Sequence, residues 1–362
     1  MPLRKALSIG IAPLNHRKTL GIVFTILGLI LAVAGPLLPG GLHLTLNTPP
    51  GAGHVTAFIA TAGGDILAGT QAGEVWRLRD ERWTRERLDL GDQPVLAMVG
   101  DPGRTPVGTA AGLAFAPAGA APLAGRVSSL LQTDQGLLAG TATGVRLLID
   151  GAWQTPGPTA MIYSLVSQRR GDGQWLHAGT IDAGVLSGSA AAPGAAWQPN
   201  NQGLPDGAKV FSFATTRGGL LLTGTDRGAF WQSQPGQPWR SLHPALDGKR
   251  VLSLLLVDDA SPGRARLWIG SDDGLSSLAV TEEGAQLTPE GSPQLADRAE
   301  QQPPLGISGI LLNQGRLLVS AGMVYEYGPT ALSGWYWISL AGVLLILIAG
   351  WLIPAPPPAV RG

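Results

Sequence analysis

Two long apolar segments enclose a region in which apolar and polar residues alternate over short distances. The first covers residues 20–38 (LGIVFTILGLILAVAGPLL) and the second covers residues 335–353 (WYWISLAGVLLILIAGWLI). Neither contains a charged side chain, and each is long enough as a helix to cross about 30 Å of hydrocarbon. The pattern therefore predicts one transmembrane α-helix near each end of the chain.

Basic residues come before the first apolar segment. Within residues 1–19 they are Arg4, Lys5, Arg17 and Lys18. Because such charges stay on the cytoplasmic side, we expect both termini, residues 1–19 and 354–362, in the cytoplasm. Residues 39–334 then lie on the extracytoplasmic side of the cytoplasmic membrane. A second interpretation is open, since Ala32-Val33-Ala34 could end a cleaved signal peptide, and it exports residues 39–334 equally.

The exported region repeats one pattern: a short apolar strand, then Gly-Thr or Gly-Ser, then two residues and another Gly. The copies are LAGTQAGEVW from Leu67, VGTAAGLAF from Val107, LAGTATGVRLL from Leu138, HAGTIDAGVL from His177, TGTDRGAFW from Thr223, IGSDDGLSSL from Ile269 and the degenerate LLVSAGMVYEY from Leu317. Another apolar run precedes each copy, and a Trp opens a further segment at Trp83, Trp153, Trp197 and Trp239. Units of up to four strands that recur about every 40 residues predict an all-β, seven-bladed β-propeller, flanked by the two helices.

The second glycine of the pattern predicts a tight hairpin, because glycine adopts positive φ without strain. Residues that fit are Gly73, Gly112, Gly144, Gly228 and Gly274, whereas the turn at Gly184 is one residue longer. The polar segment from Glu74 to Leu90 has a pattern that also suits a helix. Its alignment with the other copies predicts two strands joined at Asp80-Glu81.

The last copy lacks a fourth strand, but residues 42–46 (LHLTL) alternate as a lone strand before the first repeat. We expect this strand to complete the last blade and close the ring, which removes an unpaired edge. Both ends of the propeller then leave through one face, which we expect against the bilayer. The Gly-Thr turns and the loops that join blades lie on the opposite face.

The order of these features resembles the Asp-box (BNR) propellers, a group that includes sortilin-type receptors, sialidases and photosystem II assembly factors. The resemblance is carried by V-x-S-L, L-x-A-G-T-x-x-G-V, a Trp-led strand and an N-Q-G-L-P loop, and is best between Trp175 and Phe211. The Asp box itself is degenerate, because SAAAPGAAW from Ser189 and SQPGQPW from Ser233 keep Gly and Trp but lack Asp. The resemblance implies a propeller fold and says little about the ligand.

Composition excludes several classes of function. The chain has no Cys, and its 25 basic and 25 acidic residues balance. All 25 acidic but only 20 basic residues lie in the exported region, a net charge of −5, so we expect no nucleic-acid partner. The five His, at positions 16, 43, 54, 177 and 243, lack metal-ligand spacing, and no phosphate-binding or nucleophile-elbow motif occurs. We therefore expect no cofactor and no metal.

Sialidase-like catalysis requires a Tyr nucleophile paired with a carboxylate. The tyrosines are Tyr163, Tyr325, Tyr327 and Tyr336. Only Tyr325-Glu326-Tyr327 places a carboxylate next to a tyrosine in the sequence. Strand alternation sends the Glu326 side chain to the face opposite both tyrosines. We therefore predict that the chain is not an enzyme.

Polar residues of the tight turns and the loops between blades are the candidate binding residues: Asp182, Asp226, Arg227, Asp272, Asp273, Asn200 and Asn201. Asp and Asn also form turns readily, so a purely structural role is the alternative. The predicted function is a membrane-anchored scaffold, assembly factor or accessory subunit that binds a protein partner. A glycan-binding or sialidase-like propeller is the other hypothesis. Gly21, Gly28, Gly35, Gly342 and Gly350 are candidates for packing against partner helices.

Overall fold

The computed structural model describes residues 16–100, 106–296, 306–331 and 334–353. The predicted cytoplasmic segments therefore lie largely outside the described residues, including Arg4 and Lys5. The chain divides into two compact units. One combines Met1–Leu42 with Pro329–Gly362, and the other is His43–Gly328.

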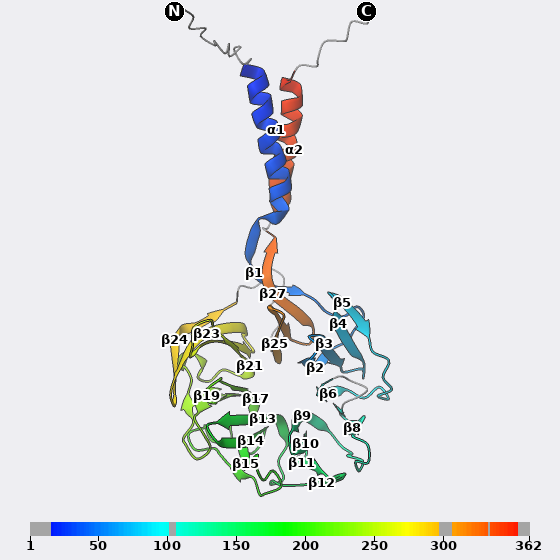
Figure 1. Cartoon of the computed structure of the whole chain (residues 1–362), viewed down its shortest axis with the longest axis vertical. Coiled ribbons are helices and arrows are strands. Elements are labelled where there is room, and N and C mark those ends of the chain that lie inside the picture. Colours follow the sequence, from blue (N-terminus) through cyan, green and yellow to red (C-terminus); the bar gives the residue numbers. More distant parts are fainter. Residues whose placement is uncertain (1–15, 101–105, 297–305, 332–333, 354–362) are drawn as a thin grey trace, which may run out of the picture. The chain divides into compact units, whose positions relative to one another are not determined.

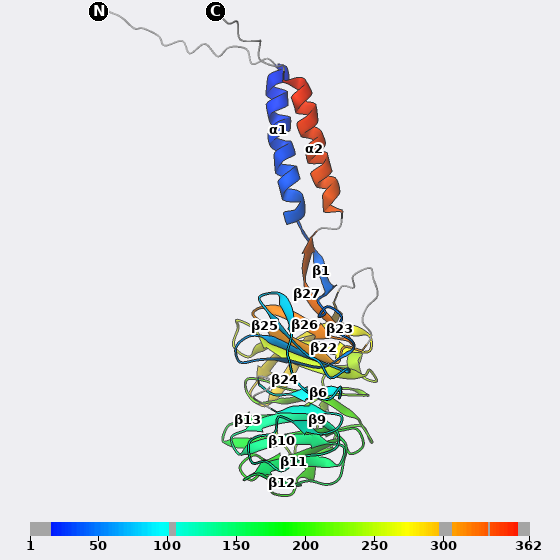
Figure 2. The ribbon, with the colours of Figure 1, turned by 90° about the vertical axis from the view of Figure 1, so that its right-hand side faces the viewer.

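The first unit is a pair of helices, α1 (His16–Ala34) and α2 (Trp335–Leu352), with a 3₁₀ turn η1 (Gly35–Leu37) after α1 (Figures 1 and 2). Both helices are apolar and long enough to cross a membrane. The first helix starts before the predicted residue 20 and ends before residue 38. Its end follows from Pro36, whose ring has no N–H and cannot continue an α-helix.

Small residues form the contact between the two helices. A Cβ placed on Gly28 would lie 2.5 Å from the Gly342 carbonyl oxygen, so only glycine permits this approach. Ser339 Oγ donates a hydrogen bond to the Ala32 carbonyl at 3.1 Å, as in close helix pairs of membranes. The expectation that glycines face partner helices is wrong for Gly21, Gly28, Gly35 and Gly342, because these face the other helix of the same chain. Gly350 takes no part, since a Cβ there meets nothing within 4 Å.

The second unit consists of seven small antiparallel sheets around a centre, and this confirms the predicted seven-bladed propeller (Figure 1). Blades 1 to 3 contain β2 (Val55–Ala60), β3 (Ile66–Thr70), β4 (Val75–Arg79) and β5 (Arg82–Arg85); β6 (Val95–Met98), β7 (Val107–Thr109) and β8 (Leu113–Ala114); and β9 (Val127–Thr133), β10 (Gly136–Thr141), β11 (Gly144–Ile149) and β12 (Ala152–Gln154).

The remaining blades follow the same order from the centre outwards. Blades 4 to 6 contain β13 (Ile162–Arg170), β14 (Gly173–Thr180), β15 (Val185–Ser189) and β16 (Gln198–Pro199); β17 (Val210–Thr215), β18 (Leu221–Thr225), β19 (Gly228–Gln232) and β20 (Arg240–Ser241); and β21 (Val251–Asp258), β22 (Arg264–Ser271), β23 (Gly274–Glu283) and β24 (Gln286–Leu295). A 3₁₀ turn, η2 (Pro244–Leu246), precedes β21. Blade 7 contains β25 (Gly309–Asn313), β26 (Arg316–Ser320), β27 (Val324–Ala331) and β1 (Pro39–Leu46).

The amino-terminal strand closes the ring, as the sequence predicts. In blade 7, Asn47 N donates to the Val324 carbonyl at 2.9 Å and Thr45 Oγ1 donates to the Glu326 carbonyl at 3.2 Å. This antiparallel pairing places the two ends of the propeller unit side by side. Both lie at the end of the blade away from the turn between β26 and β27, where Val55 N of blade 1 donates to the Gly322 carbonyl at 2.8 Å.

Neighbouring blades pack closely because the first glycine of each Gly-Thr pair has no side chain. A Cβ on Gly179 would lie 2.5 Å from Val210 Cγ1 of the next blade, and a Cβ on Gly140 would lie 2.6 Å from Ile162 Cγ2. The following hydroxyl closes the turn, as where Thr141 Oγ1 donates to the Gly144 carbonyl at 2.8 Å. The motif therefore encodes both the hairpin and the contact between blades, and only the hairpin was predicted.

The segment with the ambiguous helical pattern forms β4 and β5, as predicted. Asp80 and Glu81 join the strands with φ values of 48° and 62°. Positive φ at both central residues matches the hairpin turn that follows the right-handed twist of paired strands. A helix does not form because Trp76 and Leu78 pair in register with Arg85 and Trp83 of the next strand.

Candidate functional site

The innermost strands surround a cavity of about 300 Å³ at the centre of the ring. It is lined from β2, β6, β9, β13, β17 and blade 7 by Thr56, Ala57, Phe58, Ile59, Leu96, Ala97, Met98, Arg126, Ser128, Ser129, Leu130, Tyr163, Phe211, Ser308, Gly309 and Ser320. The cavity falls within the range of ligand-binding pockets, about 300 to 1,000 Å³.

A β-bulge recurs at the second residue of six innermost strands, where the register with the next strand shifts. The residues at these shifts, which we name the bulge ring, are Thr56, Leu96, Ser128, Tyr163, Phe211 and Leu252. A bulge leaves a residue out of the ladder and redirects its side chain. Five of the six line the central cavity. The repeated V-x-S pattern could have identified these residues, because its variable middle position is the bulged residue.

Aromatic and cationic side chains meet in one part of the bulge ring. The rings of Tyr163 and Phe211 lie edge to face with centroids 5.6 Å apart, and Tyr163 is 42% exposed. The Arg250 guanidinium lies 5.9 Å from the Phe211 centroid, within the range of a cation–π interaction. Arg126 is exposed at the cavity wall and forms no ion pair with a described residue. This part of the cavity thus offers exposed aromatic surface beside positive charge.

The predicted acidic residues lie on the face that carries the Gly-Thr turns and the loops between blades, which we name the turn face. Asp226 Oδ1 accepts from Lys209 N at 2.8 Å, and Asp182 Oδ1 accepts from Met161 N at 3.3 Å. Each carboxylate therefore joins the turn between the second and third strands of its blade to the loop that enters the same blade. These residues have structural contacts of their own, in line with the alternative that Asp is chosen for turn formation.

The other turn-face aspartates form ion pairs. Asp272 Oδ2 lies 3.1 Å from Arg250 Nη1, and Asp273 Oδ2 lies 2.9 Å from Lys249 Nζ. All four side chains are roughly half exposed, so each pair contributes little stability. The first pair holds Arg250 beside the bulge ring.

The two asparagines differ in their surroundings. Asn201 lines a cavity of about 190 Å³ with Asp182, and its Oδ1 accepts from Val185 N at 2.7 Å. Asn200 is buried, and its Nδ2 donates to Ser187 Oγ at 3.0 Å. Arg227 is exposed, and its backbone N donates to Thr225 Oγ1 at 3.0 Å. The structure thus brings Asp182 and Asn201 together and leaves the Asn200 side chain in the interior.

A buried polar chain runs between blades 4 and 5, and the sequence analysis did not identify it. His177 is fully buried, with Nδ1 2.8 Å from Ser187 Oγ and Nε2 2.9 Å from Gln168 Oε1. Burial lowers the pKa of His177 to about 3, so the imidazole is neutral. Asn200 and Gln232 continue the chain with reciprocal amide hydrogen bonds of 2.8 and 3.0 Å.

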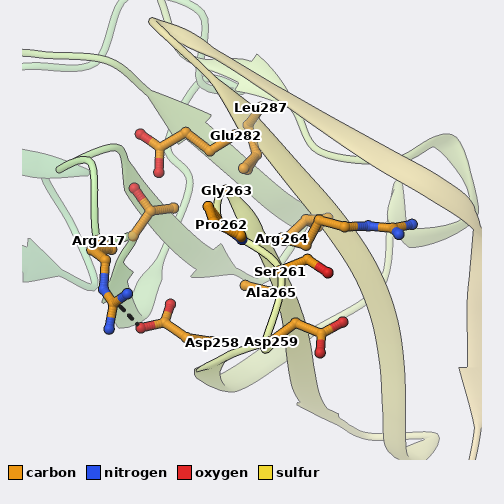
Figure 3. A pocket seen from close by; sticks show the side chains of 12 residues that line it. Arg217, Asp258, Asp259, Ser261, Pro262, Gly263, Arg264, Ala265, Glu282 and Leu287 are labelled. Atoms are coloured by element: carbon orange, nitrogen blue, oxygen red, sulfur yellow. Dashed lines mark ion pairs between the residues drawn. The ribbon is translucent and has the colours of Figure 1, made fainter.

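A second small pocket lies between blades 5 and 6 and holds only about 30 Å³, roughly the volume of one water (Figure 3). Arg217 Nε is 3.3 Å from Asp258 Oδ2 across it, and Glu282 Oε2 accepts from Gly218 N at 3.1 Å. These contacts join adjacent blades. The pocket is structural and has no room for a larger ligand.

The only tyrosine–carboxylate pairing in the sequence serves the last blade. Glu326 accepts two hydrogen bonds from Arg316, at 2.7 and 2.6 Å, and these hold the pKa of Glu326 below its usual value. Tyr325 and Tyr327 pack with Leu317 and Val319 on the opposite side, as alternation predicts. Among the described residues, no group of three His, Asp or Glu could hold a metal ion.

No protein-family model matches the sequence, and no curated protein matches it. Solved structures resemble it in fold. The extracellular domain of BT4673 from B. thetaiotaomicron, assigned to a hybrid two-component system, superposes with a TM-score of 0.59 at 16% identity, over 79% of this chain and 39% of that one. YCF48 bound to D1 peptide gives a TM-score of 0.51 at 13% identity, over 78% and 94%.

PorZ, a surface component of the type-IX secretion system of Porphyromonas gingivalis, gives a TM-score of 0.53 at 18% identity, over 79% of this chain and 48% of that one. The chain thus spans less than half the length of BT4673 and PorZ. A likeness to YCF48, a photosystem II assembly factor, agrees with part of the predicted resemblance. No family match supports the Asp-box relationship itself, which stays a prediction. At these identities the comparisons establish the seven-bladed β-propeller fold.

Proposed function

We propose that this chain is a non-catalytic binding propeller, anchored in the cytoplasmic membrane, that holds a segment of a partner protein at the turn-face end of its central cavity. The observation that carries the proposal is the bulge ring. Six innermost strands depart from regular pairing at one position, and the side chains redirected there are aliphatic, hydroxyl-bearing or aromatic. Bulges are over-represented beside active sites, where they re-aim a side chain, as well as at sheet edges and barrel rims.

The composition of the ring favours a protein segment with an acidic residue. Tyr and Arg are among the residue types that contribute most to binding energy at protein interfaces, and here they lie beside a partly exposed Phe. Tyr163 is 42% exposed, so its ring has surface left to bury. Arg126 has no ion-pair partner among the described residues, and Arg250 pairs with Asp272 while its side chain stays about half exposed. A carboxylate on the partner would therefore find an unshared positive charge.

The candidate residues of the turn face would form the outer part of this site. Asp182, Asp226, Arg227, Asp272 and Asp273 lie on the turns of blades 4 to 6, and Asn201 lies beside Asp182. Polar residues at the edge of an interface contribute mainly to specificity and to the rate of association. Asn200 would support the site from the interior.

Placement outside the cytoplasm rests on the basic residues before the first apolar segment and on two apolar helices that pack as a pair. The extracellular location of the BT4673 domain supports the same placement, and the D1 peptide held by YCF48 supports binding of a peptide. A scaffold, an assembly factor and an accessory subunit of a membrane complex all use such a module.

A photoreactive amino acid at Tyr163 tests the proposal in membranes of the native host. We expect one specific protein adduct, and we expect Arg126→Glu to reduce its yield at least about fivefold, because a charge reversal opposes an acidic partner by about 1 kcal/mol or more. The control position is Leu295, which is 50% exposed on the outer strand β24. The same adduct from Leu295, or an unchanged yield with Arg126→Glu, contradicts the proposal.

A further inference from the structure

A groove of about 520 Å³ lies on the outer part of the ring between blades 4 and 5, away from the bulge ring. Strands β14, β15 and β16 form one side, and the turn between β19 and β20 forms the other. Its walls include Trp175, Ser189, Gln198, Gln202, Pro235 and Gly236. None of the residues that line it carries a charge. The groove is therefore uncharged and large enough for about two or three sugar rings.

The floor of the groove is held rigidly by the buried polar chain. Asn200 and Ser187 line the groove and are 7% and 8% exposed. Asn200 Nδ2 donates to Gln232 Oε1 at 2.8 Å, and the Asn200 carbonyl accepts from Trp239 Nε1 at 2.7 Å. On the buried side, the hydrogen bond between His177 Nδ1 and Ser187 Oγ fixes the orientation of the Ser187 hydroxyl. A ligand thus meets a preorganised surface and does not have to order it.

The walls, in contrast, keep unused hydrogen-bonding groups. The side-chain amides of Gln198 and Gln202 and the indole N–H of Trp175 have no hydrogen-bond partner among the described residues. An amide both donates and accepts, and so does a sugar hydroxyl. The partly exposed indole ring of Trp175 offers an apolar surface for the C–H face of a sugar.

A peptide strand would fit this groove poorly. The edge strand there, β16, is only two residues long and contains Pro199, which has no N–H to donate. It cannot template the addition of another strand. A charged ligand would lose its hydration without gaining an ionic partner.

We propose that this groove binds a neutral oligosaccharide. Its hydroxyls exchange hydrogen bonds with Gln198 and Gln202, and one sugar ring packs on Trp175. The groove is separate from the bulge ring and shares only Asn200 and Asn201 with the outer part of the protein-binding site. The chain then combines a protein-binding centre with a glycan-binding groove on its outer part.

The test measures binding to the full chain in a detergent without a sugar headgroup, by titration calorimetry. The probes are neutral hexasaccharides of β-1,4-glucose, α-1,4-glucose and β-1,4-N-acetylglucosamine, with an anionic hexagalacturonate for comparison. We expect saturable binding of at least one neutral probe and weaker binding of the anionic one. Gln202→Ala should weaken binding about fivefold, the loss of one hydrogen bond. Gln234→Ala, exposed in the nearby turn but outside the groove, should leave it unchanged.

A water molecule could replace the hydrogen bond that Gln202→Ala removes. A second variant therefore fills the groove sterically. Ala195 is exposed and lines the groove, and Ala195→Trp fills the space without touching the buried chain, so it should abolish binding. Arg126→Glu, which tests the central site, should leave oligosaccharide binding intact. The inference is overturned if no neutral probe binds up to about 10 mM, a free energy near −3 kcal/mol. It is also overturned if Ala195→Trp binds as the parent chain does.

Discussion

The neutral His177 makes the stability of the propeller depend on pH in a defined window. Its imidazole has no exposed surface, and its nitrogens contact Ser187 and Gln168. Burial lowers the pKa of His177 from 6.5 to about 3. Below pH 6.5 the unfolded chain therefore binds a proton that the folded chain excludes. The contribution of the neutral His177 to the free energy of unfolding is fully present above pH 6.5 and is lost as the pH falls from 6.5 towards 3.

The magnitude follows from the pKa of the unfolded state, as long as the folded pKa stays well below 5. Between pH 7.5 and pH 5, one histidine with these pKa values lowers the free energy of unfolding by about 2 kcal/mol. Carboxylates contribute little in this interval. Asp65, for example, has its pKa lowered from 3.8 to about 2 by hydrogen bonds from Arg79 and Arg77, so its contribution is lost only below pH 4.

Urea unfolding of the full chain in micelles, followed by tryptophan fluorescence, measures this effect. The comparison is His177→Gln, which removes the titrating group and retains an amide that donates and accepts. We expect the parent chain to lose about 2 kcal/mol between pH 7.5 and pH 5, and the variant to lose only a few tenths. The pH-dependent change in the free energy of unfolding is compared between the two chains. Contributions of other groups cancel in this comparison, whatever the overall stability of the variant.

Two results would refute the reasoning. One is an equal pH dependence in His177→Gln and in the parent chain. The other is an NMR titration of the folded chain in which the imidazole of His177 is protonated near pH 6.5, since a buried and neutral ring excludes that proton.

Gly179→Ala should lower the free energy of unfolding by about 1 to 3 kcal/mol in urea titrations, because its Cβ would lie 2.5 Å from the next blade, whereas Gly53→Ala, with nothing within 4 Å, should be nearly neutral. Gly28→Leu should separate the two apolar helices and lower the thermal midpoint of the helix pair in micelles, whereas Gly350→Leu, on a face with no contact, should leave it unchanged. Asp226→Cys should react with a membrane-impermeant maleimide added outside intact cells; protection of this position by the membrane would refute the expected orientation of the turn face.

Much of the fold followed from local patterns in the sequence. Short apolar runs separated by glycine turns gave seven repeated units, and the backbone conformation at Asp80-Glu81 and Gly144 agrees with the turns expected there. The pairing of β1 with β27 was also predictable, because one strand was missing from the last unit and one was left over before the first. These features depend on the conformational preferences of a few adjacent residues and on the requirement that each edge be paired.

The candidate site was only partly predictable. The turn-face aspartates were identified as surface turn residues, but their contacts with the loop that enters the same blade join residues that only the folded blade brings together. Asn200 and Asn201 are neighbours in a loop, yet one is buried and the other lines a surface cavity. The bulge ring was hidden inside strands that looked regular. The register shift sends Val55 and Ala57 to opposite faces of the blade, but both faces are buried, so the run of apolar residues does not reveal the reversal.

Local sequence thus specified the strands, their turns and their number, because each of these depends on backbone preferences within a few residues. The tertiary structure decided which side chains meet. Position 179 must be glycine because Val210 of the next blade lies against it, and position 28 must be glycine because of a helix more than 300 residues away in the chain. His177 is neutral because the residues packed around it exclude water. Steric exclusion and burial act between residues distant in the chain, so these properties appear only when the ring and the helix pair are assembled.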